Sequence, residues 1–273
     1  MKSTPLRCLI LLAVLSTTLV FYPGLLSLSL HGQSVEQGSS DKPNIVIIYA
    51  DDLGYGDFSC YGATAFETPH CDRIAEQGML FTDAHSPSAV CTPSRYALLT
   101  GRYAWRTWMK NWIVLPHMPL LVETNRLTLP GMLQNEGYTT GCVGKWHLGW
   151  GSERNPDFSQ VLKPGPLEIG FDRFFGVPFS HNSPKYLRNY IRDRRIVGLQ
   201  EGEDIHDPAI QNRVMRSLEN TATELSAEAV SFIYQNRDRP FFLYYPTTNI
   251  HVPHTPHPRF DGQGRAGNYG EFV

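Results

Sequence analysis

The chain has 273 residues, of which 41% are hydrophobic and 18% charged, as is typical of a globular protein with a sizeable core. Its 24 Lys and Arg residues and 26 Asp and Glu residues give a formal net charge of −2, so nothing indicates a nucleic-acid-binding protein. It contains no internal repeat or low-complexity tract that would indicate a repeat or fibrous protein.

The amino-terminal segment has the layout of a secretory signal peptide. Lys2 and Arg7 precede a strongly apolar run over residues 9–22, and both features are typical of such a peptide. We expect residues 1–32 to form the signal peptide and residues 33–42, rich in Ser, Gly and Gln, to form a linker. The protein would then be secreted or periplasmic, in an extracytoplasmic compartment.

A membrane anchor is the alternative for the same segment. If the apolar run is extended to Leu30, it becomes long enough to span a bilayer. Pro23 and Gly24 interrupt that run, so we favour export of the chain. A membrane is an expected partner only if the segment stays uncleaved.

The first predicted strand, over residues 44–50, ends in two adjacent carboxylates, Asp51 and Asp52. Its almost unbroken β-branched run predicts a strand buried on both faces, as in a parallel sheet under helices. In open α/β sheets, ligands bind outside the carboxyl ends of the strands. Two acids close to Gly54 and Gly56 therefore suit a hard cation such as Ca²⁺ or Mg²⁺, and a solvated turn is the alternative.

The stretch from Cys91 to Arg95 combines a potential nucleophile, a helix start and a cation. Pro93 suits the first turn of a helix, because the N–H that proline lacks has no intrahelical partner there. Cys91 would thus lie at or just before a helix N-terminus, where free N–H groups and the macrodipole attract anions. Arg95 adds a positive charge on the same face. The pattern predicts a site for an anion, and a buried structural cysteine is the alternative.

Three tryptophans, Trp105, Trp108 and Trp112, follow at near-helical spacing. Such a stripe is more often part of the core than a surface on which sugars stack, so we expect these side chains to be packed.

Two basic segments lie further along the chain. Lys145 and His147 are two residues apart, so both side chains would face the same side of an extended segment. A basic surface patch at a strand end is the alternative for this pair. The run from Arg188 to Arg195 predicts an exposed hairpin or helix face, and attraction of anionic glycans is left open.

A loop rich in proline and histidine follows the apolar strand that begins at Phe241. His251 stands just before Val252-Pro253, and proline restricts its predecessor to extended conformations, so a rigid loop that projects an imidazole is plausible. His251 is the preferred candidate for a catalytic role, His254 is the alternative, and His257 fits a solvated position.

Strands and helices alternate over the remaining chain. Helices are predicted for residues 68–77 and 129–136, a strand for residues 138–143, and an amphipathic stretch for residues 209–235 before the strand at Phe241. Strands separated by helices favour a mainly parallel sheet covered on both faces. The predicted class is therefore α/β.

Five ordered motifs resemble the sulfatase family. They are Pro43–Gly62, Cys91–Gly101, Gly144–Gly149, Gly170–Gly176 and His251–Pro253. The arylsulfatase A and N-acetylgalactosamine-6-sulfatase type is the most similar branch, and the resemblance extends over nearly all of residues 43–273. It implies an alkaline-phosphatase-like α/β fold, with residues 43–273 as the N-terminal part of a sulfatase catalytic domain, and hydrolysis of sulfate esters.

The resemblance also implies the chemistry of Cys91. A formylglycine-generating enzyme would oxidise Cys91 to formylglycine, whose hydrate offers one hydroxyl that attacks sulfur and another that later expels sulfate. Asp51 and Asp52 would ligate a divalent cation together with residue 91, Ca²⁺ rather than Mg²⁺. Arg95 would hold the modified residue and contribute charge near the cation.

Three further roles follow from the same resemblance. Lys145 would bind a sulfate oxygen, and His147 would act as the base during elimination. His251 would bind sulfate and donate a proton to the leaving oxygen. The segment Phe179–Ser183 occupies a place where relatives contact substrate, and a segment without a functional role is the alternative. The substrate would be a sulfated small molecule or glycan.

The resemblance predicts a fold that is incomplete at the C-terminus. Relatives continue to an Asp-Asn pair that completes the metal site and to a later lysine of the sulfate pocket, so a fragment with little activity alone is expected. A phosphomonoester or phosphonate hydrolase of the same superfamily is one alternative. A catalytically inactive fragment or binding protein is the other.

Cysteine usage implies no disulfide framework. Cys8 would leave with the signal peptide and Cys91 would be modified, so Cys60, Cys71 and Cys142 could form at most one disulfide. A Cys60–Cys71 pair is possible.

Overall fold

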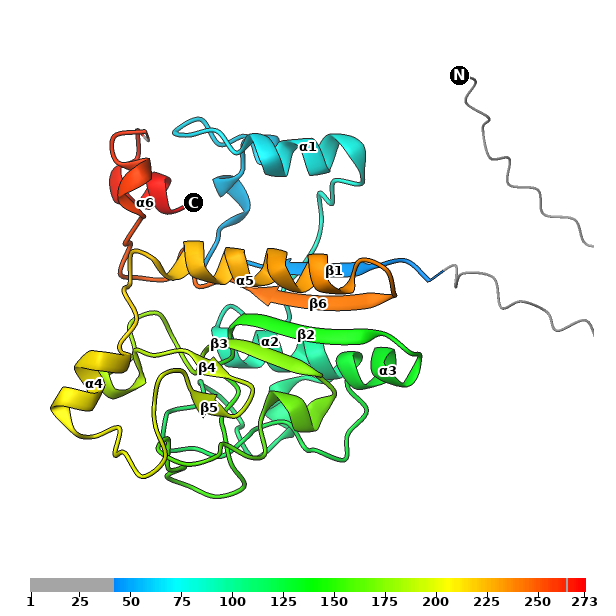
Figure 1. Ribbon diagram of the computed structural model, residues 1–273. Helices are drawn as coiled ribbons and strands as arrows, with labels where there is room; N and C mark the ends of the chain where they lie inside the picture. Colours follow the sequence, from blue (N-terminus) through cyan, green and yellow to red (C-terminus); the bar gives the residue numbers. More distant parts are fainter. Residues whose placement is uncertain (1–41, 264) are drawn as a thin grey trace, which may run out of the picture. The chain divides into compact units, whose positions relative to one another are not determined.

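The computed structural model describes residues 42–263 and 265–273, which are built around a six-stranded sheet (Figure 1). The predicted signal peptide, residues 1–32, and all but the last residue of the predicted linker lie outside the described residues. Both assignments stay predictions. Within the described part of the chain, none of the helices is both long enough and apolar enough to span a membrane.

The sheet has the strand order β1-β6-β2-β3-β4-β5. Its strands are β1 (Ile45–Tyr49), β2 (Thr139–Lys145), β3 (Arg173–Val177), β4 (Ile191–Arg192), β5 (Arg195–Ile196) and β6 (Phe241–Pro246). The first four strands in the spatial order pair in parallel, and β4 and β5 add antiparallel pairs at one edge. The predicted mainly parallel α/β sheet is confirmed.

Helices α1, α2 and α3 begin and end close to the predicted residues. They are α1 (Pro69–Gln77), α2 (Cys91–Thr100), α3 (Leu129–Asn135), α4 (Pro208–Val214), α5 (Thr221–Asn236) and α6 (Gly267–Phe272). Proline lies in the first turn of α1 and α3, where it costs no hydrogen bond. The Thr128 side chain caps α3 by accepting a hydrogen bond from Gly131 N. Helix α2 ends at Gly101, which adopts the left-handed conformation.

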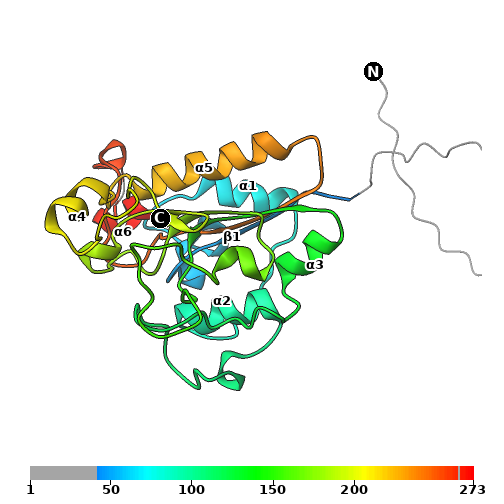
Figure 2. The same cartoon turned by 60° about the horizontal axis from the view of Figure 1, so that its bottom comes forward.

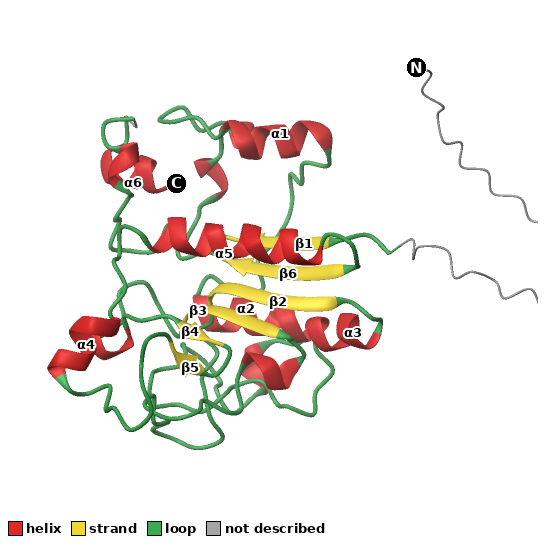
Figure 3. Cartoon of the chain, in the orientation of Figure 1, coloured by secondary structure: helices red, strands yellow, loops and turns green. Residues whose placement is uncertain are grey.

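Helices cover both faces of the sheet, as predicted (Figures 2 and 3). Alternate residues of β6 belong to two different hydrophobic cores, because successive side chains of a strand point to opposite faces. Phe242 and Tyr244 pack in the core that includes α2 and α3, whereas Phe241 and Leu243 pack in the core that includes α5. The centre of the sheet is therefore buried on both sides.

Strand β1 differs from the prediction, which expected burial on both faces. Ile45 and Ile47 pack against the α2 core, but Val46 is 43% exposed and Ile48 is 62% exposed. The reason is the position of the strand: β1 lies at the sheet edge, and α5 contacts β2, β6 and β3 instead. A continuous apolar run predicted the strand correctly but not its environment.

The predicted amphipathic stretch over residues 209–235 is also wrong as one element, because it forms two helices separated by an extended break. At the break, the Arg216 side chain turns inward and donates to His181 O at 3.1 Å and to Thr221 Oγ1 at 2.6 Å. Met215 has extended backbone angles, and Arg216 N donates to Arg188 O. These tertiary hydrogen bonds override the helical pattern.

The run from Arg188 to Arg195 contains the predicted hairpin, formed by β4 and β5. Two of its arginines are neutralised by carboxylates from elsewhere in the fold. Arg192 pairs with Glu228 of α5, and Arg194 pairs with Glu168.

Three strands come unusually close where β2 ends. A Cβ atom on Gly144 would collide with Pro246 O of β6, and a Cβ on Gly176 of β3 would collide with Gly144 O. Gly144 also has a φ of +135°, which side chains rarely tolerate. Both positions therefore require glycine, and the next residue after Gly144 is Lys145.

Candidate active site

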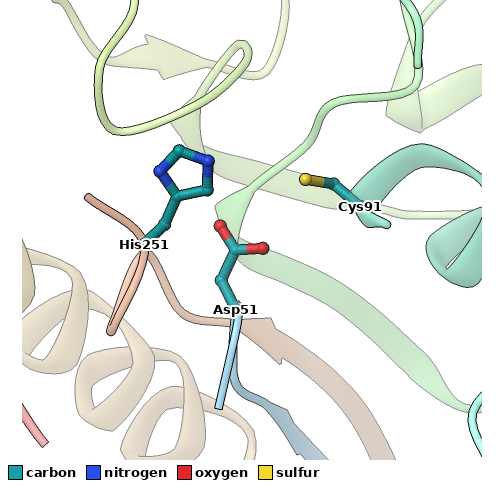
Figure 4. Close-up of side chains that lie close together, drawn as sticks. All are labelled: Asp51, Cys91 and His251. Carbon is teal, nitrogen blue, oxygen red and sulfur yellow. The ribbon is translucent and has the colours of Figure 1, made fainter. Parts of the chain in front are cut away.

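Three candidate residues from distant parts of the chain meet beyond the carboxyl ends of the parallel strands. Asp51 follows β1, Cys91 is the first residue of α2, and His251 lies in the loop after β6. One potential ligand atom from each lies within 4.8 Å of the other two. Figure 4 shows these side chains directed toward a common space. The parallel sheet explains the meeting, because its strands end at the same edge.

Asp51 is held by two buried cations. Arg95 Nη2 donates to Oδ1 at 3.1 Å, and Lys145 Nζ donates to Oδ2 at 2.5 Å. Burial alone would raise the pKa of Asp51, but the charges of Arg95 and Lys145 outweigh it and lower the pKa below its ordinary value. Asp51 is therefore ionised at neutral pH.

Arg95 links helix α2 to the end of β2. Its side chain is fully buried, its Nη1 donates to Lys145 O at 3.0 Å, and its guanidinium lies 5.5 Å from the centre of the Tyr49 ring. Burial would lower the pKa of Arg95, but neighbouring groups, among them Tyr244 and Asp51, raise it above its usual value. The guanidinium stays charged without access to water.

His147 lies close to Lys145 but not on an extended segment. Its φ of +56° turns the chain just after β2, so the predicted same-side geometry of the two side chains does not follow from alternation. The ring is 3% exposed, and its Nδ1 has no hydrogen-bond partner among the described residues. Burial, followed by the charges of Lys145 and Arg95, lowers the pKa of His147 well below its usual value. The imidazole is neutral at pH 7.

Thr92 is a residue that the sequence analysis missed. Its buried hydroxyl donates to His147 O at 2.8 Å and accepts a hydrogen bond from Val114 N at 3.0 Å. Because Thr92 directly follows Cys91, its hydrogen bond to His147 O connects the start of α2 to the turn at His147. No local pattern singles out Thr92, because both partners lie at least 22 positions away in the sequence.

His251 contacts the segment that follows the Phe-Gly motif. Its Nε2 lies 3.1 Å from Ser180 Oγ, and Ser180 Oγ also accepts from Lys145 Nζ at 3.4 Å. His254 packs edge-on against the Tyr269 ring, and His257 accepts a hydrogen bond from Arg259 N. Neither alternative histidine belongs to the cluster around Asp51.

Asp52 is separated from its neighbour Asp51. Its side chain is 50% exposed, and its Oδ2 lies 3.8 Å from His251 Nε2. The residue has a φ of +65°, so the chain turns between the two acids. The predicted pair of metal ligands is therefore divided into a buried carboxylate and a more accessible one.

The cluster of Asp51, Cys91 and His251 is a possible metal-binding group. It offers a carboxylate, a thiol and an imidazole, which is a mixed set of hard and soft donors. Cys91 is free, and so are Cys60 and Cys71, so the possible disulfide between the latter two is not formed.

The chain is similar in sequence to known sulfatases. The family model described as Sulfatase matches residues 43–271. N-acetylgalactosamine-6-O-sulfatase of Bacteroides thetaiotaomicron is 36% identical, across 94% of this chain and 58% of that protein. Arylsulfatase A of Homo sapiens is 37% identical, across 84% of this chain and 44% of that protein.

A solved structure shows the same fold. It comes from work on the metabolism of multiple glycosaminoglycans by Bacteroides thetaiotaomicron, and it matches with a TM-score of 0.78 and 36% identity. The match covers 85% of this chain and 56% of that one. The sheet and its helices therefore have the alkaline-phosphatase-like fold, and the chain spans about half the length of the curated relatives it matches.

Proposed function

The chain belongs to the sulfatase family, and from that premise we propose that it hydrolyses sulfate esters at the site around Cys91. The observation that carries the proposal is the meeting of Asp51, Cys91 and His251 within 4.8 Å, beside the buried cations of Arg95 and Lys145. A sulfate ester is an anion, and desolvated cations at fixed positions are suited to stabilise its charge.

Residue 91 is the proposed nucleophile. As formylglycine, its hydrate would supply one hydroxyl that attacks sulfur and a second whose deprotonation releases sulfate. Cys91 is only partly buried, and it opens helix α2, where backbone N–H groups lack intrahelical partners. These features support an anion approaching residue 91 from outside the sheet.

The histidines divide the proton transfers. His147 is the proposed base, because burial keeps its imidazole neutral and able to accept a proton. His251 is the proposed acid toward the leaving oxygen, because it is partly accessible and lies beside Ser180 at the rim of the site. Lys145 is the proposed sulfate ligand, and its ammonium group is positioned by a hydrogen bond to Asp51.

A divalent cation fits the donor set if residue 91 contributes oxygen. Asp51 is ionised, buried and within 4.8 Å of residue 91, where an oxygen in place of the Cys91 sulfur would give a second hard donor. The more accessible Asp52 is the proposed third ligand. We propose Ca²⁺ in preference to Mg²⁺. The bound cation would act as a Lewis acid toward the sulfate oxygens.

The proposal includes the class of substrate and the cellular compartment in which the protein acts. A relative is named N-acetylgalactosamine-6-O-sulfatase, which supports a sulfated glycan as substrate. The basic and apolar segments of residues 1–22 support export, and a formylglycine-generating enzyme would act on Cys91 during maturation. Amino-terminal sequencing of the protein from its native host tests export; retention of residues 1–32 in the cytoplasm contradicts it.

The decisive test compares two esters. The protein from its native host should hydrolyse 4-nitrophenyl sulfate faster than 4-nitrophenyl phosphate, and mass spectrometry of the peptide with Cys91 should show the aldehyde. Cys91→Ala should abolish turnover, whereas Cys60→Ala, in a cysteine away from the site, should retain it. A preference for phosphate would support the phosphohydrolase alternative, and an unmodified thiol with no turnover would support the inactive one.

A further inference from the structure

The segment after helix α2 exposes an unusual number of aromatic side chains. Tyr103 is 53% exposed, Trp105 59%, Trp108 49% and Trp112 68%. The expectation that the three tryptophans pack in the core is therefore wrong. Single exposed apolar residues are common, but four large aromatic ones within ten residues form a patch that needs a reason. We call Tyr103, Trp105, Trp108 and Trp112 the aromatic strip.

The strip is held by a well-anchored backbone. Its intervening residues Ala104, Thr107 and Met109 are buried. Thr107 Oγ1 donates to Ala104 O at 2.7 Å and accepts from Met109 N at 3.1 Å. Arg102 Nη2 donates to Arg106 O at 2.9 Å. The backbone that carries the aromatic rings is thus ordered, which reduces the entropy lost when a ligand binds.

The strip runs from one end of α2 to the other. The segment leaves the helix at Gly101, and Val114 returns to its beginning, where Val114 N donates to Thr92 Oγ1. A helix of this length spans about 15 Å. Figure 2 shows the segment projecting from α2 on the side away from the sheet. The segment that carries the aromatic strip therefore returns to the end of α2 at which Cys91 lies, and Trp112 is two residues before Val114.

The charges beside the strip are positive. Residues 101–114 contain Arg102, Arg106 and Lys110 and no acidic residue. Arg102 pairs with Glu123, whereas Arg106 and Lys110 pair with no carboxylate in the described part of the chain. The Arg106 guanidinium lies 5.7 Å from the centre of the Trp105 ring, which itself stacks on Tyr103. Arg106 and Lys110 thus place positive charge next to flat apolar rings. This combination suits a ligand that has both anionic groups and apolar faces.

We propose that the aromatic strip binds the sugar residues of a sulfated glycan next to the unit whose ester is cleaved. The proposal rests on the proposed sulfatase function for the identity of the ligand. Sugar rings present C–H faces that pack on aromatic rings, and their sulfate groups would meet Arg106 and Lys110. The strip would then select chains over single sulfated sugars.

Binding is best measured directly, because a binding constant does not depend on conversion of Cys91. A hexasaccharide of chondroitin 6-sulfate is titrated into the full chain while tryptophan emission and heat are followed. Each of Trp105→Ala and Trp108→Ala should weaken the affinity roughly tenfold, the loss expected when one aromatic contact of about 1.4 kcal/mol disappears. Trp105→Phe and Trp108→Phe should retain most of the affinity.

The control is Tyr234→Ala, which removes an equally exposed aromatic ring from α5 on the opposite face of the sheet and should leave the affinity unchanged. A desulfated hexasaccharide should bind more weakly than the sulfated one. Unchanged affinity in both tryptophan variants would overturn the proposal. So would binding of anionic phospholipid vesicles, lost in the same variants, without binding of the hexasaccharide.

The two proposals fail in different ways. If the protein hydrolyses no sulfate ester but the tryptophan variants still bind the hexasaccharide more weakly, the proposed function is wrong and the proposed binding role of the aromatic strip is supported. If the protein hydrolyses 4-nitrophenyl sulfate but the variants keep full affinity, the function stands and the strip is wrong.

Discussion

Two regions of the molecule contain arginine–carboxylate pairs with similar geometry and opposite surroundings. In the candidate site, Arg95 and Asp51 lie 3.1 Å apart, with side chains 1% and 3% exposed. At the hairpin of β4 and β5, Arg192 and Glu228 lie 2.5 Å apart, with side chains 52% and 30% exposed. The hairpin is more conspicuous in the sequence because four arginines lie within the eight residues 188–195.

Burial, and not distance, decides what such an ion pair contributes to the fold. An exposed pair is screened by water and contributes little to stability. A buried pair cannot lose one partner without leaving an uncompensated charge in the interior. The arginines of the hairpin therefore act as a solvated surface, whereas Arg95 and Lys145 fix the charge state of Asp51.

The largest effect is expected from Asp51→Asn, which removes the only carboxylate that Arg95 and Lys145 contact in the described part of the chain. Two buried cations would remain uncompensated, and the free energy of unfolding should fall by about 3–5 kcal/mol. Urea denaturation followed by circular dichroism measures it. A loss below 1 kcal/mol would place this cluster in the same class as the hairpin.

The buried histidine His181, next to Ser180 of the candidate site, should make the stability of the fold depend on pH. Burial, followed by the charge of Arg216, lowers the pKa of His181 from 6.5 to about 3. The unfolded chain therefore binds a proton below pH 6.5 that the folded chain does not bind. The stability that this neutral ring contributes is complete above pH 6.5 and decreases as the pH falls toward 3.

Between pH 7 and pH 5, this one group should reduce the free energy of unfolding by about 2 kcal/mol. In His181→Asn the decrease over the same range should be smaller by that amount. Urea denaturation at both pH values measures the difference. Equal decreases in the two proteins would show that His181 is protonated in the fold.

A substitution of Thr92 tests whether uncharged buried groups at the candidate active site also affect stability and catalysis. Thr92→Val leaves His147 O and Val114 N without their partner, and about 1–2 kcal/mol of stability should be lost. The rate constant kcat for 4-nitrophenyl sulfate should fall as His147 loses its position, and Thr92→Ser should restore it.

Thr140→Val is the matched control, because Thr140 is equally buried and bonds to Gly170 O away from the site. It should lose similar stability without the decrease in kcat. A similar kcat in Thr92→Val and Thr140→Val would reduce Thr92 to a purely structural residue.

The smallest effect is expected at the hairpin. Arg192→Met should change the free energy of unfolding by no more than about 1 kcal/mol, because the ion pair with Glu228 is solvated. High salt should abolish even this difference in the same denaturation experiment. A loss of 3 kcal/mol would remove the distinction between the two regions.

The sequence predicted what depends on local chemistry. Proline and glycine set the ends of α1 and α2, and the β-branched run predicted β1. Parallel strands deliver Asp51 and Lys145 to one edge of the sheet, whereas Asp52, predicted to bind a metal beside Asp51, is separated from it by a turn of the chain. Placement of Cys91 at the start of α2 followed from Pro93 alone.

Two errors are local, because the positive φ values of Asp52 and His147 turn the chain where extended backbone was expected. The other errors concern contacts between segments that are distant in the sequence. The exposed face of β1 depends on where α5 packs, and the break at Arg216 depends on hydrogen bonds to His181 and Arg188. The tryptophans looked like core residues because their spacing is near-helical, but the segment is anchored through the residues between them. Thr92 was missed because its partners are remote in sequence.

Gly144 and Gly176 limit how this site could be altered or transplanted. Even one methyl group at either position would push apart the strands that close up just before Lys145. A designer who grafts the charged residues onto another scaffold must therefore carry the two glycines with them. In random mutagenesis, alanine at these positions should be as rare among active clones as the loss of the ammonium group itself.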